Sequence, residues 1–217
     1  MSTRVPTHDR GLQAAFLESA GTPAARTLRT ASLMEALRWT QLLQLPAFVV
    51  SPAHTGVISQ PITCRSADEL MSAWRKIRQA AAAQRLDDHV VVQELITGRH
   101  YVVDRSAENP AAAVRIWAEA HGPLGHRDRY RLPRTGLLHR SLSLYTARVV
   151  TTIGIEDETV LCRIARDPDR GFLLLSAVVL RPGQEDDSAP EHACLGPGRI
   201  RLTPDRVVRL KGRRSAK

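Results

Sequence analysis

The chain has 217 residues, 43% of them hydrophobic, which is enough to bury the core of one large domain or of two smaller lobes. It contains no run of about 18 apolar residues and no apolar centre of a secretion signal near its start, so the pattern argues against a membrane span or export and favours a cytoplasmic location. The formal net charge is +9, and residues 199–217, with eight basic residues and one acidic residue, carry +7 of it, so nucleic-acid binding by this tail stays one alternative.

The first part of the chain predicts helices separated by short strands. Apolar residues at helical spacing predict a helix over residues 9–20, and a short strand over residues 27–29 follows it. Ser32 and Glu35 form a capping box that begins a second helix, and Ser66 and Glu69 begin a long third helix. Between these two helices, the buried strand "LPAFVVSP" leads into a loop that is expected to return as another strand.

The rest of the chain predicts mostly strands. The stretch "VVQELITGRHYVVD", residues 91–104, reads as two strands of one hairpin joined by a turn at Thr97 and Gly98. After it we expect a strand at "AAVRIWAEA", a surface loop over residues 121–136, a helix over residues 142–154, and two strands joined by the turn "PDRG". The segment "GQEDDSAPEH" reads as an acidic linker, and "RIRLTPDRVVRL" predicts a last hairpin.

Four of these motifs, in their order along the chain, resemble the ATP-grasp superfamily of carboxylate-amine ligases. They are "ESAGTPAART", "PAFVVSP", "VVQELITGRHYVVD" and "YTARVVTTIGI", and the likeness is strongest to ligases that make dipeptides and related natural products. The resemblance implies an α+β fold with two lobes and mostly antiparallel sheets, which in the family hold ATP between them. It places a first lobe at residues 1–88, a second at 89–183, and the acidic linker and basic tail at 184–217, with the family's preceding domain expected to be missing.

The resemblance assigns nucleotide-binding positions to six residues, namely Arg10, Ser51, Gln93, Glu94, Leu95 and His100. Arg10 and Ser51 stand where the family has phosphate-binding lysines, and a serine hydroxyl supplies no positive charge. Gln93, Glu94 and Leu95 keep the pattern of the adenine-binding connector. His100 stands where the family has a glutamate that accepts two hydrogen bonds from ribose, which an imidazole cannot do.

The family's two magnesium ligands fall on Arg163 and Ser176. A fixed positive charge at the first position should repel a divalent cation, so we expect no metal and no cofactor. We also expect Arg163 and Ser176 to face the former metal site from adjacent antiparallel strands, with Arg163 paired to an acidic group rather than buried alone.

These replacements predict a pseudoenzyme, a noncatalytic binding or scaffold subunit beside a biosynthetic ligase. The alternative is a divergent ligase that uses ATP and Mg²⁺ to form an amide bond through an acylphosphate. A protein partner or self-association is expected in the first case, and the Arg163 charge suggests a small anionic ligand in the cleft.

Overall fold

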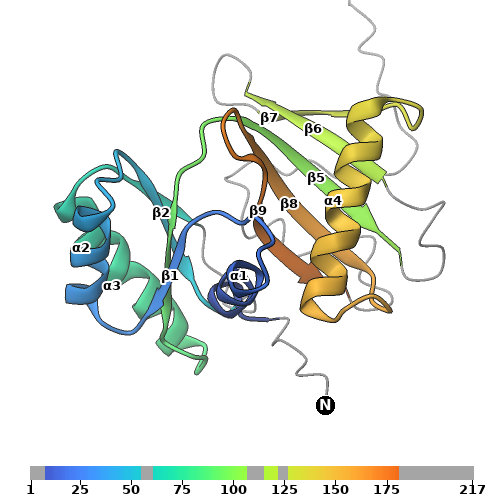
Figure 1. The fold of residues 1–217 in the computed structure, drawn as a ribbon. Helices are drawn as coiled ribbons and strands as arrows, with labels where there is room; N and C mark the ends of the chain where they lie inside the picture. The colour runs from blue at the N-terminus through green and yellow to red at the C-terminus, as the bar shows by residue number, and fades with distance from the viewer. Residues whose placement is uncertain (1–7, 55–60, 107–114, 122–126, 181–217) are drawn as a thin grey trace, which may run out of the picture.

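The computed structural model describes residues 8–54, 61–106, 115–121 and 127–180, which form four helices and two antiparallel sheets (Figure 1). This α+β architecture confirms the predicted fold class. In Figure 1, α2 and α3 lie at one side of the molecule, α4 lies at the other, and α1 lies between them. None of the helices in the described ranges combines the length and the hydropathy that a membrane span needs.

The small sheet has four strands in the order β1-β4-β2-β3. Its strands are β1 (Thr27–Thr30), β2 (Phe48–Pro52), β3 (Ile62–Cys64) and β4 (Val90–Glu94), and the helices α2 (Leu33–Leu42) and α3 (Ala67–Ala83) cover one face. Both helices begin at the predicted capping serines, because the Ser32 hydroxyl accepts the Glu35 N–H and the Ser66 hydroxyl accepts the Glu69 N–H. Alternate strand residues such as Val50 then pack against these helices.

The large sheet has five strands in the order β7-β6-β5-β8-β9. Its strands are β5 (Arg99–Arg105), β6 (Arg115–His121), β7 (Arg127–Arg131), β8 (Val160–Asp167) and β9 (Gly171–Val179), and the helices α1 (Arg10–Ser19) and α4 (Leu137–Ile153) pack on one face. Leu17 of α1, Leu142 of α4 and Ile164 of β8 are fully buried in the core between these layers. Helix α4 ends where Gly154 adopts a left-handed conformation with φ 72°.

The predicted hairpin at residues 91–104 is wrong. Its two strands exist, but β4 pairs with β1 and β2 in the small sheet, whereas β5 pairs with β6 and β8 in the large sheet. Residues 95–98 therefore connect the two sheets instead of reversing the chain. Gly98 is required there because a Cβ atom at this position would lie 1.8 Å from the carbonyl oxygen of Arg166.

Two further expectations differ from the structure, and a third lies outside it. Strand β7 lies inside the segment that was predicted to be a surface loop. It is an edge strand with the polar sequence "RDRYR", which gives no apolar signal of a strand. Helix α4 begins at Leu137, five residues earlier than expected, and Gly136 provides no side-chain cap that could mark the start. The acidic linker and the last hairpin lie outside the described residues.

The extent of each lobe stays a prediction. The boundary expected between residues 88 and 89 falls just before β4, which belongs to the small sheet. Helix α1, expected in the first lobe, packs on the large sheet, where the Gln13 side chain donates to the Ala177 carbonyl at 3.0 Å.

Candidate functional site

A cavity of about 180 Å³ lies between the two sheets. The small sheet lines it with alternate residues of β2 and β4, because Val49 pairs with Gln93 and Ser51 pairs with Val91, and directly paired residues share a face. The complete lining comprises Arg10, Val49, Ser51, Pro61, Thr63, Val91, Gln93, Leu95, His100, Leu161, Arg163, Leu175, Ser176 and Val178.

The large sheet lines the cavity by the same alternation. Leu161 and Arg163 of β8 face the cavity. The alternate residues of the same strand, Cys162 and Ile164, are buried in the core under α1 and α4. Arg163 pairs directly with Ser176 of β9, so the expected adjacency of these two residues at the cavity is confirmed. A register slip of one residue would exchange the cavity face and the core face.

Seven of the eight residues singled out in the sequence line this cavity, namely Arg10, Ser51, Gln93, Leu95, His100, Arg163 and Ser176. Glu94 is the exception. Its carboxylate accepts the Arg26 N–H at 2.6 Å and pairs with Arg170 at 2.7 Å, outside the cavity lining. The structure therefore brings the residues together, while their binding roles stay predictions.

Arg163 is held in the cavity by a carboxylate that the sequence did not single out. Its Nη2 lies 3.4 Å from Oε2 and 3.5 Å from Oε1 of Glu119 on β6. The Glu119 side chain is 1% exposed and that of Arg163 is 21% exposed, which confirms the expected acidic partner. The sequence contained one sign of this residue. Glu119 lies two positions after Trp117 in the strand "RIWAEA", so the two side chains are expected on the same face of the sheet.

A β-bulge adjoins the Arg163 and Ser176 pair. The register shifts between Arg163 and Ile164, which leaves Leu175 as the extra residue of β9. The Gln93 side chain donates to the Leu175 carbonyl at 3.1 Å and to the Thr27 hydroxyl at 3.1 Å. Gln93 therefore spans the cavity edge and joins the two sheets.

Three other polar side chains of the lining differ in whether they make hydrogen bonds within the protein. The His100 Nε2–H donates to the Ile96 carbonyl at 2.8 Å, which holds the connector between the sheets. By contrast, the hydroxyls of Ser51 and Ser176 make no hydrogen bond within the part of the chain that the structure describes. Ser51 is only 5% exposed as a residue and lines the cavity, from which its hydroxyl is accessible.

A second group of charges joins the sheets beside the cavity. Arg170, in the turn between β8 and β9, pairs with Glu94 at 2.7 Å and with Asp167 at 3.2 Å. Hydrogen bonds from the Arg170 backbone and side chain hold the pKa of Asp167 below its ordinary value. The Glu94 hydrogen bond in turn raises the pKa of Arg170.

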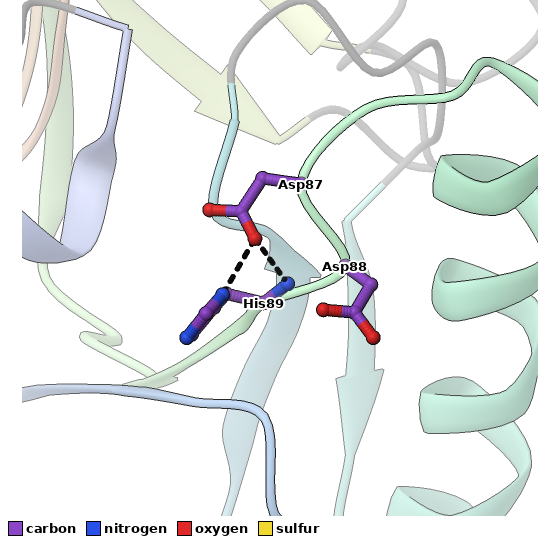
Figure 2. A group of neighbouring side chains, drawn as sticks. All are labelled: Asp87, Asp88 and His89. Atoms are coloured by element: carbon purple, nitrogen blue, oxygen red, sulfur yellow. Dashed lines mark hydrogen bonds and ion pairs between the residues drawn. The ribbon is translucent and has the colours of Figure 1, made fainter.

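A cluster with metal-ligand residue types lies elsewhere, at Asp87, Asp88 and His89 (Figure 2). Figure 2 shows Asp87 accepting both the backbone and the ring N–H of His89. Burial alone would raise the pKa of Asp87, but these hydrogen bonds and the charges of His89 and Arg29 outweigh it and lower the pKa. Because Arg29 pairs with Asp87 and Arg78 pairs with Asp88, the cluster is an ion-pair network that already neutralises its carboxylates.

The two described cysteines are poor nucleophiles. Burial raises the pKa of the Cys64 thiol to about 11 and that of the Cys162 thiol to about 12. Both thiols therefore stay protonated at neutral pH and serve as apolar core residues.

Comparison by sequence identifies no relative: no protein-family model and no curated protein sequence matches the chain.

Comparison by structure identifies ATP-grasp ligases. A D-alanine-D-alanine ligase from Coxiella burnetii matches with a TM-score of 0.56 and 11% identity, over 80% of this chain and 48% of that one. An L-amino acid ligase from Bacillus licheniformis matches with a TM-score of 0.59 and 14% identity, over 82% of this chain and 41% of that one. The ATP-grasp ligase PsnB complexed with minimal precursor matches with a TM-score of 0.54 and 18% identity, over 79% of this chain and 52% of that one. The chain thus has an ATP-grasp-like fold and spans about half the length of these proteins.

Proposed function

We propose that this protein is a noncatalytic binding or scaffold subunit with an ATP-grasp-like fold, which works beside a ligase of peptide or natural-product biosynthesis. The observation that carries the proposal is the placement of Arg163 in the cavity, opposite Ser176 and paired with Glu119. By the resemblance, both members of the Arg163 and Ser176 pair stand where a ligase of this fold holds magnesium with carboxylates.

Electrostatics argue against magnesium beside Arg163. Two unit charges at 4 Å interact by about 4 kcal/mol at an effective dielectric constant near 20, so a divalent ion there would be repelled by about 8 kcal/mol. The Glu119 carboxylate offsets part of this repulsion, but it is already paired with Arg163. ATP-dependent transfer of a phosphoryl group needs that metal to neutralise charge in the transition state.

The polar groups around the cavity also support a noncatalytic role. Gln93 and His100, assigned to nucleotide binding by the resemblance, use side-chain N–H groups on the protein itself. His100 could not accept a ribose hydroxyl at Nε2, because that nitrogen donates to the Ile96 carbonyl. Ser51 offers a hydroxyl where the resemblance expects a lysine charge.

Contacts between the sheets favour a binding protein over an enzyme that opens and closes in each turnover. The Gln93 side chain contacts the Leu175 carbonyl, Arg170 pairs with Glu94, and the Ala25 N–H donates to the Leu174 carbonyl at 3.0 Å. All three would have to break if the sheets separated.

The second candidate is a divergent ligase that forms an amide bond with ATP and Mg²⁺. The structural likeness to D-alanine-D-alanine ligase and to PsnB favours it, since one PsnB complex contains Mg and ADP. Incubation with magnesium-ATP and a mixture of amino acids separates the two candidates. We expect no phosphate release above the protein-free background and no amide product by mass spectrometry, whereas an amide product that requires the protein would establish the ligase.

Two further measurements test the association and tail hypotheses. Sedimentation velocity should show self-association, or a complex when a ligase of the same biosynthetic pathway is added. A monomer that binds no such ligase would contradict the scaffold role. Salt-sensitive retention of DNA or RNA would instead favour the basic tail as a nucleic-acid site.

A further inference from the structure

We propose that the cavity between the sheets binds a small aliphatic carboxylate through Arg163, Ser51 and Ser176, without a metal ion. This inference rests on the proposed function, because a magnesium-loaded cavity would have different charge and different ligands.

The donors for an anion are present and unoccupied. Arg163 contacts Glu119 only through Nη2, and its Nε and Nη1 make no hydrogen bond within the described residues. The contacts to Glu119, at 3.4 and 3.5 Å, are longer than the 2.7–2.9 Å that is typical of strong charge-assisted hydrogen bonds. The guanidinium therefore keeps donors for a second carboxylate.

Two hydroxyl groups complete the site from opposite sheets. Ser176 lies directly opposite Arg163 in the large sheet, and Ser51 faces the same cavity from the small sheet. The Ser51 residue is 5% exposed but its hydroxyl is accessible from the cavity, so a ligand that accepts its hydrogen bond replaces water there. A bound carboxylate has lone pairs on two oxygens and can accept from Arg163 and from both hydroxyls.

The size and the charge of the cavity select the kind of anion. Its volume of about 180 Å³ is smaller than the roughly 300–1,000 Å³ of sites for drug-sized ligands, which favours a body of a few carbon atoms. Half of the lining residues are aliphatic, namely Val49, Pro61, Val91, Leu95, Leu161, Leu175 and Val178. Because seven aliphatic side chains line the cavity and Arg163 already shares its charge with Glu119, an aliphatic carboxylate matches the site better than inorganic phosphate, which has no apolar part.

A matched pair of probes tests the proposal. The protein is titrated with 3-methylbutanoate and with its uncharged analogue 3-methylbutanamide, in the presence of EDTA, and followed by backbone amide NMR shifts. We expect saturable shifts at cavity residues with the carboxylate and at least tenfold weaker binding of the amide, because the amide loses the charge-assisted hydrogen bonds. Equal binding of the two probes, or no binding of either, would overturn the proposal.

Three variants locate the binding residues. Arg163→Gln should weaken 3-methylbutanoate binding by roughly tenfold or more, and Ser51→Ala by a smaller factor. Arg166→Gln is the control, because Arg166 lies on the same strand, is exposed and does not line the cavity. Circular dichroism checks that each variant is folded. Should Arg163→Gln not fold, Ser51→Ala and the two probes still decide the question.

The outcomes separate this inference from the proposed function. If neither 3-methylbutanoate nor magnesium-ATP binds, the carboxylate site is wrong while the noncatalytic role stands. If inorganic phosphate displaces the carboxylate at equal concentration, the selectivity for an aliphatic monoanion is wrong. Magnesium-dependent binding of ATP in the cavity would contradict both proposals.

Discussion

Replacing Arg163 with methionine should lower the free energy of unfolding by about 2 kcal/mol. The change strands the Glu119 carboxylate, whose side chain is 1% exposed, and breaking a buried ion pair from one side costs about 3–5 kcal/mol. We expect less here because the two contacts are 3.4 and 3.5 Å long, Arg163 is 21% exposed and Glu119 retains another interaction. Urea unfolding followed by tryptophan fluorescence measures the difference.

A double-mutant cycle shows whether the loss comes from the pair. Glu119→Gln in the Arg163→Met background should recover part of the lost stability, with a coupling free energy of about 1–2 kcal/mol. Arg166→Met, at an exposed arginine of the same strand, should change stability by no more than about 0.5 kcal/mol. If Arg163→Met costs no more than this control, or if the two changes are additive, Arg163 is not held by Glu119.

Three other predictions concern the connector, the turn and the two positions that the resemblance assigns to metal ligands. Gly98→Ala should destabilise the protein by about 3 kcal/mol or more in urea unfolding, because its Cβ would lie 1.8 Å from a carbonyl oxygen of β8, and a wild-type midpoint would contradict this. Arg170→Met should lower the free energy of unfolding by about 1 kcal/mol at neutral pH, measured by urea unfolding. The pKa of Asp167 is lowered from 3.8, so its stabilising contribution is present above that pH and is lost on acidification. The part of the difference between wild type and Arg170→Met that comes from Asp167 should shrink below about pH 3.8, and a difference that does not change on acidification would contradict this. The double variant Arg163→Glu, Ser176→Glu should be less stable than wild type and should gain thermal stability from Mg²⁺, and no response to Mg²⁺ would show that these positions do not form a metal site.

The helices and most strands could be predicted because their signals are local. Ser32 and Ser66 mark helix starts through hydrogen bonds to residues three positions along the chain, and both bonds are present. The start of α4 at Leu137 was missed because Gly136 carries no capping side chain. Strand β7 was missed because four of its five residues are charged, so its sequence has no apolar periodicity.

Strand pairing could not be read from the sequence. Residues 91–104 contain two strands and a glycine between them, which is the local pattern of a hairpin. Which strand pairs with which depends on contacts between distant segments, such as Val103 with Cys162 and Val92 with Leu28. Gly98 serves the close approach of two backbones rather than a turn.

Most of the cavity could be located from motif order, but its internal contacts could not. The resemblance selected Ser51, His100 and Arg163, which all line the cavity although they lie far apart in the sequence. It also selected Glu94, which faces out of the cavity because side chains alternate along β4 and its neighbour Gln93 faces in. Glu119 was missed because a lone glutamate in a strand has no partner identifiable without the fold.

Isothermal titration of the protein with magnesium-ATP tests the central claim most directly. The Arg163 guanidinium occupies the cavity position that the resemblance assigns to a metal ligand, and Ser176 opposite it supplies no carboxylate. We predict no saturable heat with magnesium-ATP at concentrations up to the millimolar range, and the same result when EDTA replaces the magnesium. Micromolar binding that requires magnesium would contradict the account.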